Sequence, residues 1–179
     1  MFVGDVMIDT LLRILDRAVP AAGTLGRALP RYAVLTLHRP SNVDDAATLA
    51  ALLDEIAHLD ARVPVVFPLH PRTRASIEKF GLAAKIENLI VLPPLGYLEM
   101  LGLMKDAKLV LTDSGGIQEE TTALGVPCLT LRENTERPIT LDEGSNTLVG
   151  PHPEAIRKVF MEILDNGGKA GRIPEYWDG

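Results

Sequence analysis

Residues 108–131 contain the strongest candidate for a ligand site in this sequence. They read KLVLTDSGGIQEETTALGVPCLTL, a pattern that predicts a buried strand, a turn with two glycines, a helix and a second buried strand. The turn Asp113-Ser114-Gly115-Gly116 would follow the carboxyl end of the first strand, where α/β proteins bind their ligands. Both glycines would let the backbone approach a ligand closely and adopt φ values that other residues avoid.

The predicted helix begins near Ile117, and its start is suited to hold an anion. The first amides of a helix have no intrahelical partner and the helix dipole is positive at this end, so a phosphate can bind there without a lysine. Glu119 and Glu120 would repel a diphosphate, so we expect at least one of them to face hydroxyl donors such as those of a ribose. An ordinary helix start with acidic residues stabilised by the dipole is the alternative for this turn. Asp113 could also be a phosphoacceptor, although no other residue supports that.

Polar side chains follow four of the predicted strands. They are His38, Arg39, Ser41, His70, Arg72, Asp113, Ser114, Arg132, Glu133, Glu136 and Arg137. Polar residues occur by chance in any one loop, but their recurrence at four strand ends predicts a single polar crevice. His38 and His70 could each be a hydrogen-bonded structural histidine, or could neutralise charge or transfer a proton beside a diphosphate. Arg132 and Arg137 could form salt bridges with the neighbouring glutamates, or one of them could bind a phosphate or a sugar.

Strands and helices alternate along the chain from residue 31. Apolar runs predict strands at 32–37, 64–69, 89–92, 109–111, 126–131 and 146–149, and helical spacing predicts helices at 44–59, 74–80, 97–105, from 117 onward, and at 153–164. This alternation with short loops is typical of an α/β protein with a doubly wound, Rossmann-like parallel sheet. Residues 1–30 hold a helix followed by a stretch rich in Pro, Gly and Ala, which we interpret as a connection leading into residues 31–179.

The composition excludes several classes of function. The chain has 179 residues, a net charge of −6 and scattered Lys and Arg, so binding to nucleic acid is not expected. Cys128 is the only cysteine and lies in an apolar strand, which indicates a core residue. A metal site is not expected because the carboxylates near the two histidines lack a tight ligand spacing. We see neither a signal peptide nor a membrane-spanning stretch, which makes the cytoplasm the expected compartment.

Taken together, these motifs resemble those of the non-hydrolysing UDP-N-acetylglucosamine 2-epimerase family. The matching segments are LTLHRPSNVDD (35–45), FPLHPRT (67–73), PPLGYLEMLGLM (93–104), LVLTDSGGIQEETTALGVPCLTLRENTERPIT (109–140), GSNTLVG (144–150) and the final WDG. GDVMID, at 4–9, resembles the connection between the two domains of that family. The resemblance covers nearly the whole chain from residue 31 onward.

The resemblance implies a glycosyltransferase-B type fold, in which two Rossmann-like domains close on a UDP-sugar, and this chain resembles the second domain. It implies that Ser114, Gly115 and Gly116 bind the diphosphate, Glu120 the ribose, Arg137 the nucleotide-sugar, and Leu95 and Met100 the uracil, with Met100 replacing a residue that is often aromatic. It further implies that His38 acts at the diphosphate side of the reaction centre. No cofactor is implied. The reaction converts UDP-GlcNAc to UDP-ManNAc by eliminating and re-adding UDP.

In that family the carboxylates that handle the C2 proton lie in the first domain, and a last helix follows WDG. We therefore expect this chain to bind UDP but to need the missing domain or a separate subunit for turnover, and the full-length form to be a homodimer. An exposed Trp177 near the end would also indicate a shortened chain. The alternatives are a non-catalytic UDP-sugar binding half of a split enzyme, and a domain of a hydrolysing epimerase or a glycosyltransferase. A nicotinamide oxidoreductase is not expected, since no G-x-G-x-x-G follows the first strand.

Overall fold

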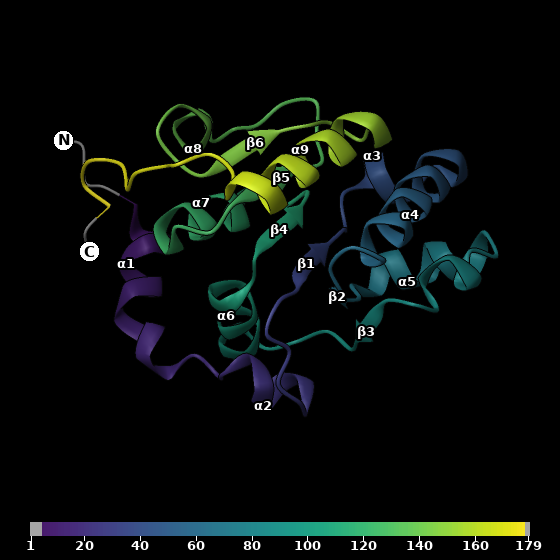
Figure 1. Cartoon of the computed structure of the whole chain (residues 1–179), viewed down its shortest axis with the longest axis horizontal. Coiled ribbons are helices and arrows are strands. Elements are labelled where there is room, and N and C mark those ends of the chain that lie inside the picture. The colour runs from purple at the N-terminus through teal and green to yellow at the C-terminus, as the bar shows by residue number, and fades with distance from the viewer. Residues whose placement is uncertain (1–4, 178–179) are drawn as a thin grey trace.

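Six parallel strands form one sheet in the order β3-β2-β1-β4-β5-β6 (Figure 1). The computed structural model describes residues 5–177, so Gly4 of the GDVMID segment and the last two residues of WDG lie outside the described part. The strands are β1 Ala33–Thr36, β2 Val65–Pro68, β3 Ile90–Leu92, β4 Leu109–Thr112, β5 Cys128–Thr130 and β6 Asn146–Leu148. The predicted doubly wound parallel sheet is confirmed, and its strand order reverses between β1 and β4, where such sheets bind ligands.

The helices precede, connect and follow the strands, and they cover both faces of the sheet. They are α1 Val6–Ile14, α2 Ala21–Leu25, α3 Pro40–Val43, α4 Ala46–Asp60, α5 Pro71–Lys79, α6 Tyr97–Asp106, α7 Gly115–Leu124, α8 Pro138–Asp142 and α9 Pro153–Asn166. Two short 3₁₀ helices, η1 Leu15–Arg17 and η2 Ala83–Ile86, complete the set. The longer helices match the predicted ones, whereas α3 and α8 are too short for a periodic pattern to indicate them.

Two hydrophobic clusters hold the layers together, one on each face of the sheet. The larger joins alternate strand residues such as Leu35 and Phe67 to α4 and α9, and the smaller joins Val34 and Val110 to α6 and α2. Because neighbouring residues of one strand point to opposite faces, a strand covered on both sides is apolar throughout. Leu109, Val110 and Leu111 are accordingly fully buried, as predicted for a central strand.

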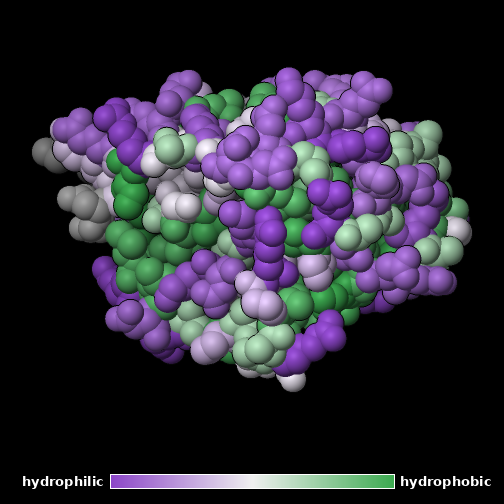
Figure 2. Space-filling view, in the orientation of Figure 1, coloured by the Kyte–Doolittle hydropathy of each residue, from purple (hydrophilic) through white to green (hydrophobic). Residues whose placement is uncertain are grey.

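The segment before β1 packs on the α6 and α7 side of the sheet. α1 lies against α7 and α2 lies against α6 (Figure 1). The backbone N–H of Val19 donates to the carbonyl of Leu98 at 3.0 Å. A Cβ atom at Gly102 would lie 1.7 Å from the Val19 carbonyl oxygen, so only glycine allows this approach. Figure 2 shows an apolar area over α1, where Val6 and Met7 are exposed.

Two expectations about local structure are wrong. α7 begins at Gly115, two residues before the predicted start at Ile117, so both glycines belong to the first helical turn. Trp177 is only 5% exposed, whereas the sequence predicted an exposed side chain. The tail that carries it is tied to the domain by a hydrogen bond from the Arg172 N–H to the Glu143 carbonyl at 2.8 Å.

Candidate functional site

The carboxyl ends of β1 and β4 lie side by side and form the centre of the site. Their register pairs Thr36 with Thr112, and the two hydroxyl groups are 2.7 Å apart. The Thr112 hydroxyl also accepts the backbone N–H of Ser114 at 3.0 Å. Ser114 has an extended backbone and is the N-cap residue of α7, but its side chain makes no capping hydrogen bond. The Ser114 hydroxyl and the first backbone amides of α7 therefore lie together at the N-terminal end of the helix.

Gly115 and Gly116 provide space at this end rather than unusual backbone angles. Neither has a positive φ, since the positive values in the described residues occur at other glycines and at Tyr176, so that part of the prediction is wrong. A Cβ atom at Gly116 would lie 3.0 Å from Cε of Met7, a residue of α1. A Cβ atom at Gly115 would lie 3.9 Å from Glu136. Gly116 thus leaves room for the Met7 side chain, whereas the space beside Gly115 would admit a Cβ atom.

His38 is fixed by a buried carboxylate at the end of β4. Its Nδ1 lies 3.0 Å from Oδ1 of Asp113, which is fully buried. Asp113 also accepts the backbone N–H groups of His38 and Arg39 at 2.9–3.1 Å and the side-chain amide of Asn42 at 3.2 Å. Burial acts to raise the pKa of Asp113, but hydrogen bonds from His38 and Arg39 outweigh it and hold the pKa below its usual value.

An ionised Asp113 can only accept hydrogen bonds, so Nδ1 of His38 must carry a proton. This leaves Nε2 of His38 to act on a ligand. The same burial excludes Asp113 as an accessible phosphoacceptor. Sequence reasoning missed its role as the anchor of His38, because the pairing follows from β1 and β4 being neighbours in the sheet.

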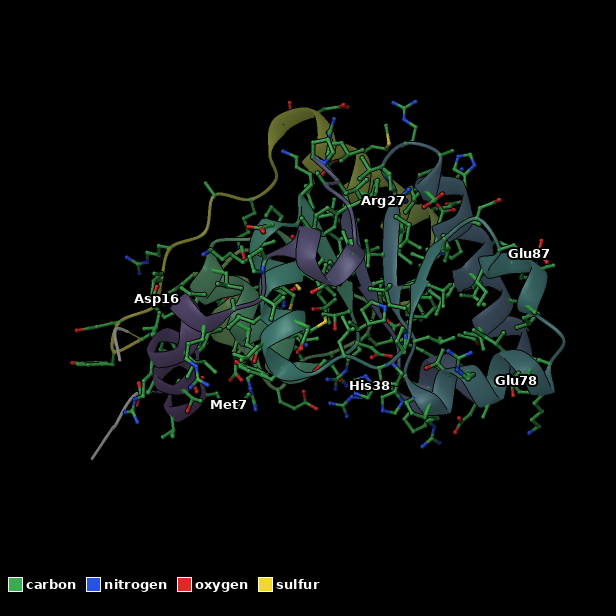
Figure 3. All side chains as sticks on the ribbon, turned by 90° about the horizontal axis from the view of Figure 1, so that it is seen from below. Met7, Asp16, Arg27, His38, Glu78 and Glu87 are labelled. Atoms are coloured by element: carbon green, nitrogen blue, oxygen red, sulfur yellow. The ribbon has the colours of Figure 1, made fainter. Side chains whose placement is uncertain are left out.

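Two adjoining cavities at this edge bring together most of the predicted site residues. One, of about 220 Å³, is lined by His38, His70, Leu95, Met100, Ser114 and others. The second, of about 410 Å³, is lined by Leu95, Met100, Ser114, Gly116 and Glu120, together with Met7 and Tyr97. Since they share four lining residues, Leu95, Met100, Ser114 and Ile117, we treat them as one cleft. Figure 3 shows Met7 and His38 near the same, lower edge of the molecule.

Glu120 lines the second cavity, and among the described residues its carboxylate has one hydrogen-bond partner. Its side chain is 6% exposed, and Oε1 accepts the hydroxyl of Tyr97 at 2.9 Å. Burial raises the pKa of Glu120, and the Tyr97 hydrogen bond acts in the opposite direction. Tyr97 is the first residue of α6 and is 43% exposed. Neither Tyr97 nor Met7 was a predicted site residue, since helical periodicity marks only the inward stripe of a helix.

Arg137 does not line the two cavities. Its guanidinium forms an ion pair with Glu119, on the side of α7 that faces α8. Burial and the nearby Asp5 carboxylate raise the pKa of Glu119 to about 7, against the opposing effect of Arg137. Asp5 caps α1 by accepting the Met7 N–H at 2.9 Å, so this cluster joins α1, α7 and the start of α8.

The predicted cluster of Arg132, Arg137, Glu133 and Glu136 forms only in part. Arg132 contacts both carboxylate oxygens of Glu136 at 2.8 Å, and this hydrogen bonding lowers the pKa of Glu136 to about 2. Glu133 instead pairs with His152 at 2.8 Å.

His70 is a hydrogen-bonded histidine that also lines the first cavity, whereas its action beside a diphosphate stays a prediction. It caps α5 by accepting the Arg72 N–H at 3.2 Å, and its ring centroid lies 5.4 Å from that of His38.

The remaining candidate chemistry is absent from the described part of the chain. Cys128 is fully buried, and burial raises the pKa of its thiol to about 12, which fits an unreactive core residue. Among residues 5–177, no group of three or more His, Cys, Asp or Glu side chains could hold a metal ion. No described helix is both long enough and apolar enough to cross a bilayer.

Comparison with known proteins gives a consistent match over the whole chain. The family model for UDP-N-acetylglucosamine 2-epimerase matches residues 1–179. A UDP-N-acetylglucosamine 2-epimerase from Methanococcus maripaludis is 50% identical over 139 residues, which cover 75% of this chain and 38% of the relative. The UDP-2,3-diacetamido-2,3-dideoxy-D-glucuronate 2-epimerase of Pseudomonas aeruginosa is 42% identical, and the match covers 97% of this chain and 51% of the relative.

Solved structures agree. The Methanocaldococcus jannaschii UDP-GlcNAc 2-epimerase in complex with UDP-GlcNAc and UDP has a TM-score of 0.85 and 36% identity, covering 99% of this chain and 52% of that one. An Escherichia coli heptosyltransferase with ADP is 17% identical with a TM-score of 0.51, so it shares the fold alone. The chain spans about half the length of the curated relatives that it matches.

Proposed function

The chain belongs to the UDP-N-acetylglucosamine 2-epimerase family, and we propose that it is the UDP-binding half of an enzyme that epimerises UDP-GlcNAc at C2 to UDP-ManNAc. The observation that carries the proposal is the cleft at the ends of β1 and β4. It places the open N-terminal turn of α7, the Asp113-anchored His38 and the carboxylate of Glu120 along one surface. A nucleoside diphosphate presents a base, a diol and a diphosphate, and this surface offers a partner for each of them.

Each part of the ligand has a partner in this arrangement. The uracil lies between Leu95 and Met100, two partly buried apolar residues that pack on the smaller hydrophobic cluster. The diphosphate lies at Ser114, Gly115 and Gly116, where amides and the positive end of the helix dipole favour an anion. The ribose diol donates to Glu120. In this proposal residues 31–179 form the UDP-binding domain, and residues 1–30 connect it to the other half.

The geometry also suits the elimination step. Breaking the bond between C1 and the β-phosphate oxygen leaves negative charge on UDP, and fixed amides at the start of α7 stabilise that charge most in the transition state. His38, held by Asp113, adds a second group on the diphosphate side. UDP then re-adds after the proton at C2 has been replaced from the other face.

We assign no role in proton transfer at C2 to residues of this chain. Among the described residues, Glu120, which binds Tyr97, is the one carboxylate that lines the two cavities, and Asp113 is buried behind His38. The proposal places the acid and base in the other half of the enzyme, whether on the same polypeptide or a separate subunit. Homodimer formation by the full-length form and a cytoplasmic location stay predictions, as does Arg137 as a nucleotide-sugar ligand.

Isothermal titration calorimetry with UDP tests the proposal on the intact chain. We expect Ser114→Ala and Glu120→Ala each to weaken binding by roughly tenfold or more, since each removes a hydrogen bond to a charged group, worth about 1.5–3 kcal/mol. Glu78→Ala, at an exposed position of α5, is the control and should bind UDP like the wild type. Unchanged affinity in both site variants would place the nucleotide elsewhere.

A second candidate substrate is UDP-2,3-diacetamido-2,3-dideoxy-D-glucuronate, the substrate in the name of the Pseudomonas aeruginosa relative. The match to the diacetamido-glucuronate epimerase covers 97% of this chain, against 75% for the Methanococcus maripaludis enzyme. Both substrates carry UDP and a 2-acetamido group, so the UDP site described here serves either. Product analysis by NMR separates these substrates, and also separates epimerisation from the alternatives in which a hydrolysing epimerase or a glycosyltransferase releases UDP. A non-catalytic binding half would give no product even when the other half is supplied.

A further inference from the structure

We propose that Tyr97 is a positioning residue that orients the Glu120 carboxylate toward a ribose diol and so sets the preference for ribonucleotides over deoxynucleotides. The inference rests on the proposed function, because it takes UDP as the ligand of the cleft. It concerns a residue that touches the binding carboxylate rather than the reacting atoms.

The first step is the direction of the hydrogen bond between the two residues. Oη of Tyr97 lies 2.9 Å from Oε1 of Glu120. An ionised carboxylate can only accept, so the tyrosine hydroxyl is the donor. Its lone pairs then face away from Glu120, and the bond holds Oε1 in place.

The second step is the state of the other carboxylate oxygen. No described group donates to Oε2 of Glu120, and this oxygen is not among the buried side-chain atoms that lack a partner. The Glu120 side chain lines both the cavity that holds Ser114 and Gly116 and the smaller one beside Met7. With Oε1 occupied, Oε2 is the oxygen left to accept the hydroxyl groups of a ligand.

The third step is the unusual exposure of Tyr97. The residue is 43% exposed at the first position of α6, and it belongs to neither hydrophobic cluster in the described structure. Within the described residues, the Tyr97 hydroxyl forms a hydrogen bond with Glu120 alone. Tyr32 provides the contrast, since it is 1% exposed and its hydroxyl donates to the Leu103 carbonyl at 2.8 Å. The Tyr97 hydroxyl therefore donates to a residue of the cleft, whereas the Tyr32 hydroxyl donates to a carbonyl in the core.

The fourth step is the arrangement of the residues around the proposed ribose site. Tyr97 comes from α6, Glu120 from α7 and Met7 from α1, and all three line the same cavities. A ribose placed at Glu120 would have its diol against a carboxylate fixed on one side by Tyr97 and covered on another by Met7. Without the tyrosine hydroxyl the carboxylate can rotate, and part of the binding energy is then used to reorder it.

The test compares UDP with 2′,3′-dideoxy-UDP, which lacks both ribose hydroxyls, by calorimetric titration of the intact chain. We expect the wild type to bind UDP at least tenfold more tightly than the dideoxy analogue. Tyr97→Phe should weaken UDP binding by about three- to tenfold and leave binding of the analogue unchanged. In a Glu120→Gln background the same substitution should change neither affinity by more than about twofold.

Tyr32→Phe is the matched control, because it removes a hydroxyl from the core instead of the cleft. It should lower the melting temperature and leave the ratio of the two affinities unaltered. Equal weakening of UDP and the analogue by Tyr97→Phe, or no weakening of either, would overturn the inference while UDP binding to the wild type still supports the proposed function. Absence of UDP binding to the wild type would overturn both.

Discussion

At the scale of single residues, Asp113 connects the end of β4 to the segment that follows β1. It has no exposed surface, and it accepts hydrogen bonds from His38, Arg39 and Asn42. Asn42 extends the connection by donating to the Leu131 carbonyl after β5 at 2.9 Å. One carboxylate thus fixes the ends of three neighbouring strands, and with them the position of the His38 ring.

Replacing Asp113 by Asn tests this connection. An amide presents an NH₂ group to at least one of the donors and carries no charge, so we expect a loss of about 2–3 kcal/mol in the free energy of unfolding. Urea unfolding followed by circular dichroism measures it. Asp16→Asn, at an exposed residue of η1, is the control and should change stability by less than about 0.5 kcal/mol. Equal stability of the two variants would contradict the role given to Asp113.

Glu119 gives a prediction about pH. Its pKa is raised to about 7 from a usual value of 4.5, first by burial and then by Asp5. Between these two values the unfolded chain releases the proton that the folded chain keeps, so stability falls as pH rises from 4.5 to 7 and changes no further above that range. The loss is on the order of 2 kcal/mol.

Glu119→Gln removes this titration, so its stability relative to the wild type should increase between pH 4.5 and 7. Urea unfolding at pH 5, 6 and 7 measures the difference. Glu87→Gln, at an exposed position, should follow the wild-type curve at every pH. If the Glu119→Gln curve ran parallel to that of the wild type, Glu119 would be ionised in the folded chain and paired with Arg137 throughout.

At the scale of elements, the apolar runs of the strands and the periodic apolar residues of the helices were enough to predict the parallel sheet and the longer helices. The glycine-rich turn that leads into α7 also followed from the sequence, because such a turn after an apolar strand is a local pattern. Anion binding at this end of α7 stays a prediction. The His38–Asp113 pair could not be predicted in this way, since 75 residues separate the two and only the strand order brings them together. The positive φ expected at Gly115 and Gly116 was wrong because both residues lie within the helix.

The contact between α6 and the segment before α2 provides a test at this scale. Gly102 of α6 lies so close to the Val19 carbonyl that an added Cβ would overlap it at 1.7 Å. Gly102→Ala should therefore push this segment away and lower the free energy of unfolding by about 1–3 kcal/mol. Gly23→Ala is the control, since a Cβ there would lie 3.4 Å from a flexible Val19 methyl group and alanine favours a helix by up to about 1 kcal/mol. Thermal melts of both variants decide the matter, and a stable Gly102→Ala would show that α6 and its neighbour can separate freely.

At the scale of the whole molecule, the cleft runs along one edge of the sheet and is built from α1, α6, α7 and the segment after β1. The part beside His38 is lined by histidines, prolines, apolar residues and the hydroxyl residues Thr36 and Ser114, and no carboxylate of the described chain lines it. Removing the proton at C2 of the sugar needs a base on one face and an acid on the other. Under the proposed function, this chain binds and activates the nucleotide, and the residues that handle the proton lie outside it.

Exchange of the C2 proton in heavy water tests that division of labour. The 179-residue chain incubated with UDP-GlcNAc in D₂O should incorporate no deuterium at C2, because no carboxylate of the described chain lines the part of the cleft beside His38. Calorimetry on the same sample should still detect UDP binding. The Methanocaldococcus jannaschii enzyme, about twice as long as this chain, serves as the positive control in the same NMR measurement. Deuterium at C2 with this chain alone would mean that His38 or His70 acts as the base, and the division between the two halves would have to be redrawn.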